Sequence, residues 1–143
     1  MTRRDWTLLV IATAKSPVSP VQLQKALFLL GENLTRDQIG TGSFFHFTPY
    51  DYGPFDSDVY AEAEQLERER LVQIETPAFS YRQYLATDDG RARAEDLKRQ
   101  LSTDAAVYLE QVVTWVRSRS FNDLVRAIYQ AYPHMKANSV FRD

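Results

Sequence analysis

The sequence contains no cysteine, which excludes disulfide bonds, cysteine nucleophiles and metal sites built on thiolates. It has two histidines, His46 and His134, and neither belongs to a His-x-x-x-His or similar pattern of paired metal ligands. Its five glycines are scattered, so no glycine-rich phosphate-binding loop is present. We therefore expect a protein that is not an enzyme and that uses no metal or other cofactor.

Long apolar runs and an excess of positive charge are also missing. No segment approaches the length of about 18 apolar residues that a membrane-spanning helix needs. The net charge is −2, which gives no overall attraction to phosphate polymers. Without a recognisable signal sequence or cysteine, we expect a cytoplasmic protein that does not contact a membrane.

What is present is enough apolar material for one folded domain, since 44% of the 143 residues are hydrophobic and 13% are aromatic. Asp5 is expected to cap a first helix over residues 6–15, which is apolar nearly all round. Residues 19–22 predict the start of a second helix, with serine at the cap, proline next and glutamine completing a capping box. A leucine repeat forms its buried stripe. Lys25 lies off that stripe and is expected to be solvated.

The middle of the chain predicts a strand, a turn, a charged helix and a hairpin. Residues 44–48 are rich in aromatics and read as a short strand. Prolines and glycine then force a turn before a helix over residues 56–70, which Asp56 or Ser57 can cap. Residues 71–75 and 81–86 predict the two strands of a hairpin.

The remaining chain predicts three more helices. Thr87 should cap the first of them, which runs to about residue 101, and Ser102 or Thr103 opens the second. Ser120 should cap the last helix, over residues 121–132, and the tail after it shows no period.

This order predicts an α+β fold that is mostly α, a winged helix-turn-helix with a wing sheet of two or three strands and additional C-terminal helices. Residues 1–101 would form the winged-helix domain. Residues 102–143 would form a helical extension packed on it, so that the chain is a single compact unit. The charged helix over residues 56–70 then occupies the position of a recognition helix.

Three short motifs resemble those of a known family. They are the run at residues 23–30, which begins Leu-Gln-Lys, the loop at residues 50–55, which ends Tyr-Gly-Pro-Phe, and the end of the wing at residues 85–90, which closes with Thr-Asp-Asp-Gly. Together they resemble the YwgA-like and SocA-like (Panacea) winged-helix proteins of bacteria and phages. The resemblance implies a small non-enzymatic domain, antitoxin-like or adaptor-like, that binds proteins such as a toxin or a defence or regulatory component.

The charged helix suggests how a protein partner would be bound. Residues 56–70 hold six acidic and two basic residues, a net charge of −4. One helix face is expected to expose an acidic stripe, which can steer and select a basic partner. The aromatic loop beside it can supply anchors. The predicted partner-binding residues are Tyr50, Tyr52, Phe55, Asp58, Glu62, Gln65 and Glu69. The alternative for the stripe is a solvated surface, and for the loop it is rings tucked under the helix.

A DNA-binding transcriptional regulator that acts as a dimer is the alternative function, because many winged helices bind DNA. The acidic stripe disfavours it, since phosphates repel carboxylates. The residues that would contact DNA under this alternative are Arg68, Arg70, Arg82, Arg91 and Arg93.

A homodimer through the terminal helices is a further possibility that the apolar residues raise. The first helix and the helix that begins near residue 103 carry more apolar surface than a small winged helix needs, and terminal helices can pair about a two-fold axis. The alternative is that these helices pack on each other within one chain. The residues that suggest pairing are Trp6, Tyr108, Val112, Trp115 and Val116.

Overall fold

The computed structural model describes residues 1–78 and 80–142. These residues form a mostly helical fold with two small antiparallel sheets of two strands each, which confirms the α+β, mostly α prediction. The α-helices are α1 Arg3–Thr13, α2 Pro20–Asn33, α3 Arg36–Ile39, α4 Asp58–Arg68, α5 Asp88–Lys98, α6 Thr103–Arg117 and α7 Phe121–Ala131. The strands are β1 Thr48–Tyr50, β2 Gly53–Phe55, β3 Val72–Glu75 and β4 Gln83–Ala86, and a 3-10 helix, η1 Pro133–Lys136, follows α7.

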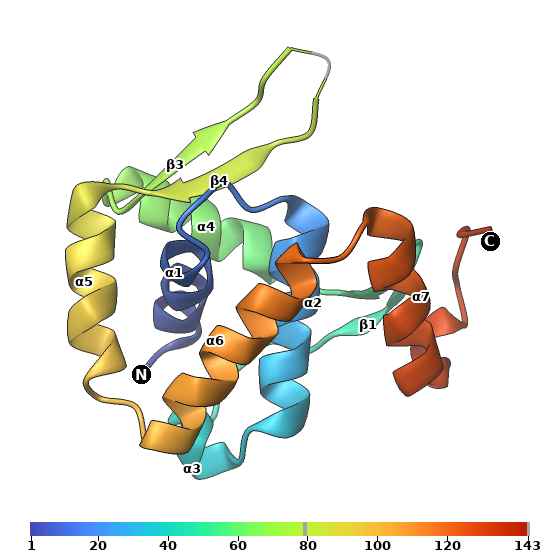
Figure 1. Ribbon diagram of the computed structural model, residues 1–143, viewed down its shortest axis with the longest axis horizontal. Helices are drawn as coiled ribbons and strands as arrows, with labels where there is room; N and C mark the ends of the chain where they lie inside the picture. The colour runs from blue at the N-terminus through green and yellow to red at the C-terminus, as the bar shows by residue number, and fades with distance from the viewer. Residues whose placement is uncertain (79, 143) are drawn as a thin grey trace.

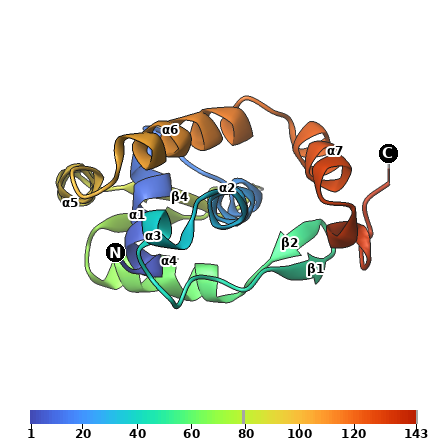
Figure 2. The same cartoon turned by 90° about the horizontal axis from the view of Figure 1, so that it is seen from below.

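The helices are stacked in layers around α1 and α2. Seen from below, α1 and α2 lie between α6 above them and α4 with the β1–β2 hairpin below them (Figure 2). One hydrophobic cluster runs through all three layers and includes Leu27 of α2, Leu66 of α4, Val113 of α6 and Ile128 of α7. Residues 1–101 and residues 102–143 therefore share a single core. Among the described residues, no helix combines the length and the hydropathy needed to cross a membrane.

The first helix is central to this core, as its sequence predicts, because residues 6–13 are all buried. Its cap differs from the prediction. Thr2 is the N-cap, and Asp5 lies three residues into the capping box, where its carboxylate accepts a hydrogen bond of 2.9 Å from the Thr2 amide. Helix α2 begins with the predicted capping box of Ser19 and Gln22.

The predicted strand at residues 44–48 is wrong. Residues 44–47 belong to no strand, since their aromatic rings pack against the helices instead: the ring of Phe47 meets that of Phe28 of α2 edge to face at 5.6 Å. Strand pairing begins at Thr48 and joins β1 to β2 across the expected turn. Gly53 permits this turn because its φ of +102° is disfavoured for residues with a Cβ.

The predicted hairpin of β3 and β4 is confirmed, and it projects from the body of the molecule (Figure 1). Val18, between α1 and α2, adds an antiparallel bridge to it. The amide of each residue donates to the carbonyl of the other over 2.9 Å between Val18 and Tyr84. The sheet beside α4 therefore has two strands and one bridging residue.

The C-terminal helices begin at the predicted caps Thr87, Ser102 and Ser120, while α5 ends earlier than expected, at Lys98. The tail, for which no period was found, is tied to the β1–β2 hairpin. Asn138 donates to the carbonyl of Pro49 over 3.2 Å, and the amide of Val140 donates to the carbonyl of Asp51 over 2.9 Å. The tail is thus hydrogen-bonded to the turn that joins β1 to β2.

Candidate functional site

The acidic stripe of α4 is turned toward α1 and is paired with arginines there. Glu62 accepts from Arg3 Nε at 3.1 Å and from Arg4 at 3.2 Å, and its side chain is only 12% exposed. Asp58 pairs with Arg3 at 3.2 Å, and Glu69 pairs with Arg4 at 3.4 Å. The expectation that this stripe is fully exposed is therefore wrong for Glu62. The reason is that two arginines more than 50 positions away compensate its charge.

The other polar side chains of α4 are engaged as well. Gln65, which is half-buried, donates to Glu69 over 3.1 Å and accepts from Arg68 over 2.9 Å. Glu64 lies 3.6 Å from Arg82 of the hairpin. The helix begins with a cap from Asp56, whose carboxylate accepts from the amides of His46 and Asp58, whereas Ser57 makes no capping bond.

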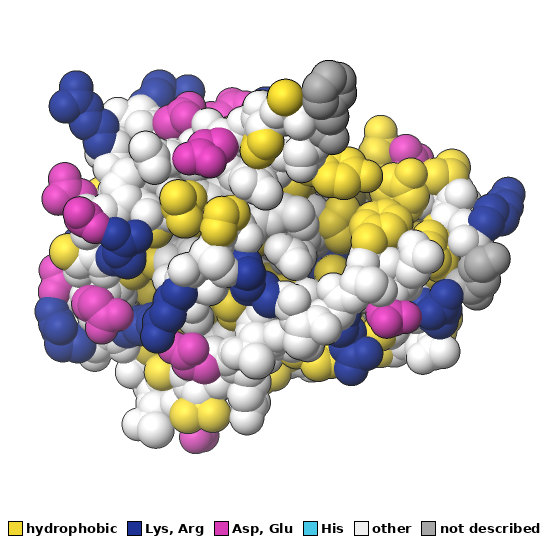
Figure 3. All heavy atoms as spheres, turned by 45° about the horizontal axis from the view of Figure 1, so that its top comes forward, with side chains coloured by type: hydrophobic (Ala, Val, Ile, Leu, Met, Phe, Trp, Pro, Cys, Tyr) yellow, Lys and Arg dark blue, Asp and Glu magenta, His cyan; other side chains and the backbone are white. Residues whose placement is uncertain are grey.

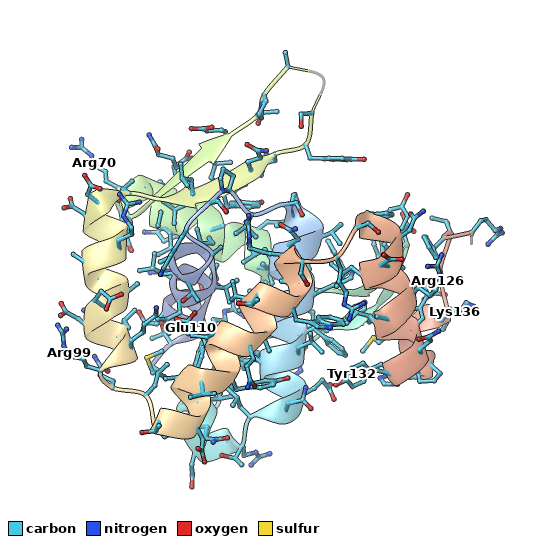
Figure 4. All side chains as sticks on the ribbon, viewed as in Figure 1. Arg70, Arg99, Glu110, Arg126, Tyr132 and Lys136 are labelled. Carbon is cyan, nitrogen blue, oxygen red and sulfur yellow. The ribbon has the colours of Figure 1, made fainter. Side chains whose placement is uncertain are left out.

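The arginines considered for DNA do not form one patch. Arg82 pairs with Glu64, Arg91 with Asp88, and Arg93 with Asp5. Arg70 lies at the end of α5 opposite to Arg99, and both side chains point away from the body of the molecule (Figure 4). A DNA duplex would therefore contact arginines on this side that are either isolated or neutralised by a carboxylate.

The aromatic loop is displayed on its outer side. Tyr50 is 52% exposed and Tyr52 is 41% exposed, while Phe55 is half-buried. Tyr50 stacks on Phe55 with ring centroids 4.7 Å apart. Tyr52 meets Phe121 of α7 edge to face at 5.1 Å. The loop thus exposes two tyrosines, each of which packs against the ring of a phenylalanine.

The prediction that Lys25 is solvated is wrong. This residue is 3% exposed, because Val21, Phe28 and Leu29 surround it on its own helix and the β1–β2 hairpin covers it. Its ammonium donates to the carbonyl of Pro54 at 3.3 Å. Burial lowers the pKa of Lys25 to about 8. The apolar residues at positions i−4, i+3 and i+4 were the signal in the sequence that would have indicated this burial.

Two of the motifs behind the family resemblance meet at this point. Gln24 brackets the backbone of Asp56, donating to its carbonyl at 2.9 Å and accepting from its amide at 3.1 Å. Lys25 holds Pro54 of the Tyr-Gly-Pro-Phe loop. The Leu-Gln-Lys run of α2 therefore fixes the aromatic loop in place.

A small cavity of about 150 Å³ lies beside Lys25, and we call it the lysine cavity. Its principal walls are Val21 and Lys25 of α2, Tyr50, Tyr52 and Phe55 of the hairpin and Tyr60 of α4. Gln24, Asp51 and Gly53 also border it. A Cβ on Gly53 would lie 3.7 Å from the ammonium of Lys25 and 3.2 Å from the ring of Tyr129, so glycine lets the hairpin approach both.

A larger aromatic groove of about 450 Å³ adjoins the lysine cavity, because Val21 and Tyr52 border both. Its apolar walls are Pro20, Val21, Tyr52, Tyr81, Phe121 and Leu124. Tyr81 is 79% exposed and Phe121 is 43% exposed. Hydrophobic side chains gather at this place between the β3–β4 hairpin and α7 (Figure 3). The charged residue on the groove is Arg119, whose guanidinium lies over the ring of Trp115.

The residues proposed for dimerisation are largely inside the molecule. Trp6, Val112 and Val116 are buried, because α1, α2 and α6 pack on one another and the indole of Trp6 donates to the carbonyl of Ile39 at 2.8 Å. Tyr108 and Trp115 are half-buried. The internal alternative thus accounts for most of the apolar surface on these helices.

The two histidines lie in different surroundings. His46 borders a cavity next to α3, and His134 packs against Tyr132 in η1. In the described part of the chain, no group of three acidic or histidine side chains is arranged to hold a metal ion. Comparison with models of protein families, with characterised proteins and with solved structures finds no match to this chain.

Proposed function

We propose that this protein is a non-enzymatic winged-helix regulatory module, antitoxin-like or adaptor-like, that binds a protein partner through the aromatic surface of the β1–β2 hairpin. The order of elements supports the winged-helix assignment. Helix α1, the bridging residue Val18, helix α2, helix α4 and the β3–β4 hairpin follow one another as helix, strand, helix, helix and wing. Helix α3 and the β1–β2 hairpin are inserted between the last two helices.

The observation that carries the proposal is the exposure of aromatic rings on a hairpin that is fixed from both sides. Tyrosine and phenylalanine are favoured anchors in protein interfaces because they bury large apolar areas. Lys25 holds this hairpin from the α2 side, and Asn138 and Val140 hold it from the tail side. A rigid hairpin loses little conformational entropy on binding, so more of the contact energy remains as affinity.

The ion pairs of α4 change which part of the predicted surface would bind. Glu62 is enclosed by arginines and is not free to steer a basic partner. Asp58 and Glu69 are exposed but paired, and an exposed pair has little net field for a partner to sense. We therefore assign binding to Tyr50, Tyr52 and the adjacent aromatic groove, and we assign the acidic stripe to stability.

Capture of partners from extracts of the source cells with tagged variants tests the proposal. A partner that binds the wild type should be lost with Tyr52→Ser and with Phe121→Ser, which remove groove walls at the exposed surface. It should be retained by Arg70→Ala, which alters a surface residue at the far end of α4. Retention by both groove variants would contradict the proposal. Loss on nuclease treatment, together with a steep salt dependence, would favour the DNA alternative.

A further inference from the structure

We infer that the lysine cavity receives a carboxylate group of the protein partner, which forms a buried ion pair with Lys25. The inference rests on the proposed function, because the partner is the polypeptide that covers the aromatic groove. It commits that partner to an acidic side chain or chain terminus placed next to an apolar residue.

The ammonium of Lys25 has an incomplete set of hydrogen bonds among the described residues. An ammonium has three donors, and within the described parts of the chain this one makes a single hydrogen bond, to the carbonyl of Pro54 at 3.3 Å. The side chain is 3% exposed, so an acceptor for its other donors has to enter the lysine cavity beside it. A buried charge is costly unless it is paired, and no carboxylate among the described residues lies within ion-pair distance of this ammonium.

The space beside the ammonium has the size and the character that a carboxylate on an apolar group needs. The cavity of about 150 Å³ is lined mainly by apolar side chains and aromatic rings. This volume equals that of about five waters, which is room for a carboxylate and a few carbons. A carboxylate accepts short, charge-assisted hydrogen bonds, and the rings around it would exclude water from the pair.

The lysine cavity adjoins the aromatic groove. Tyr52 and Val21 border both spaces, so a segment that lies in the groove passes the mouth of the cavity. Of the described residues, the groove has Arg119 on its border and no acidic one. This charge balance favours an occupant that is apolar and negatively charged.

Several titratable groups surround Lys25. Tyr50 and Tyr52 of the hairpin, Asp51 of its turn and Tyr60 of α4 line the lysine cavity with it. Tyr129 of α7 lies next to Gly53, as the Lys25 ammonium does. Burial raises the pKa of Tyr60 and of Tyr129, so these phenols stay neutral where Lys25 titrates. Because burial lowers the pKa of Lys25 to about 8, a bound carboxylate should raise it again.

Phenylacetate, a carboxylate on an apolar ring, probes the cavity without the partner, and phenylacetamide is its neutral control. The chain has four lysines, so carbon-13 labelling of lysine Cε resolves each of them by NMR. We expect phenylacetate at about 10 mM, ten times a Kd of about 1 mM, to shift the Lys25 signal and raise its titration midpoint by up to about one pH unit. Phenylacetamide should do neither. No shift of Lys25, or an equal shift with phenylacetamide, would overturn the inference.

Two variants separate this inference from the proposed function. Lys25→Met keeps the apolar stem and should lose both phenylacetate binding and the captured partner, with a fold at least as stable as that of the wild type. Lys15→Met, at an exposed lysine, should retain both. Phenylacetate should also displace the captured partner, whereas phenylacetamide should not. A partner that Lys25→Met retains, but that Tyr52→Ser loses, would overturn the carboxylate inference and leave the proposed function standing. Phenylacetate binding without displacement would overturn it too.

Discussion

Two regions of this molecule handle charge in opposite ways. The acidic stripe of α4 looks, in the sequence, like a free negative surface, yet Arg3 and Arg4 of α1 pair with its carboxylates. Lys25 looks like an ordinary solvated lysine, yet it is buried under the hairpin, and no described carboxylate pairs with it. The charge count of a segment therefore says little about which charges are available to a ligand.

The difference has a physical cause. In a surface ion pair each charge already has a counter-charge, so the carboxylates of the stripe gain little by binding a basic partner. A buried ammonium with one acceptor retains an electrostatic cost that an incoming carboxylate can reduce. The stripe is thus expected to contribute to stability, and the hairpin with Lys25 to binding.

The largest test of this contrast is Glu62→Lys. The new ammonium would face both Arg3 and Arg4 at a position whose side chain is 12% exposed. We expect the free energy of unfolding to fall by about 3 kcal/mol, because partly buried like charges replace two ion pairs. Urea unfolding followed by circular dichroism measures this change.

Two comparisons sharpen that result. Glu32→Lys, at an exposed position of α2, should change stability by less than about 0.5 kcal/mol. Combining Glu62→Lys with Arg3→Glu and Arg4→Glu should restore part of the loss, as coupled sites do. If the Glu62→Lys protein is as stable as the wild type but no longer binds the partner, the stripe contributes to binding and not to stability, which would contradict our assignment.

Lys25→Met gives the opposite sign and a smaller effect. We expect the free energy of unfolding at pH 7 to rise by about 2 kcal/mol, since the cost of the buried charge disappears and one hydrogen bond is lost. The same urea experiment measures it, with Lys15→Met as the control. A marked destabilisation would mean that the bond to Pro54 is worth more than the burial costs.

The pH dependence checks the cause of that gain. The pKa of Lys25 is about 8 in the folded chain and 10.5 in the ordinary solvated state. Between these values the unfolded chain holds a proton that the folded chain has released, so the stability of the wild type rises with pH through this range. The gain in the free energy of unfolding from Lys25→Met should therefore be complete below pH 8 and should disappear as the pH rises to 10.5. An advantage that does not change with pH would point to packing instead of charge.

Local signals in the sequence predicted much of the fold, and tertiary contacts account for the errors. The helices that begin at Ser19, Thr87 and Ser120 were predicted because a cap bonds to amides two or three residues away. The strand at residues 44–48 was misplaced because its rings pack on helices that the segment itself does not encode. The candidate site followed the same rule: the loop motif predicted Tyr50 and Tyr52 as candidate residues, and both are exposed. The burial of Lys25 and the pairing of Glu62 depend on elements far away in the chain.

Gly53→Ala should have a moderate effect on the hairpin. The φ of +102° and the approach of the new Cβ to Tyr129 at 3.2 Å both disfavour alanine. We expect a loss of about 1 kcal/mol in the free energy of unfolding. Because the turn would shift, partner capture should weaken as well. Gly42→Ala, which has open space around the new Cβ, is the matched control and should leave both unchanged.

Tyr50→Ser should have the smallest effect on stability and a clear effect on binding. Tyr50 is 52% exposed and loses mainly its stacking on Phe55, so the free energy of unfolding should fall by about 0.5 kcal/mol. Partner affinity should fall about tenfold or more, as for an interface anchor. Val107→Ser, on α6, removes a side chain that is 51% exposed and should leave partner affinity unchanged. Equal partner affinities of Tyr50→Ser and Val107→Ser would show that the hairpin rings contribute to the fold and not to binding. The acidic stripe and the hairpin would then differ only in how they affect stability.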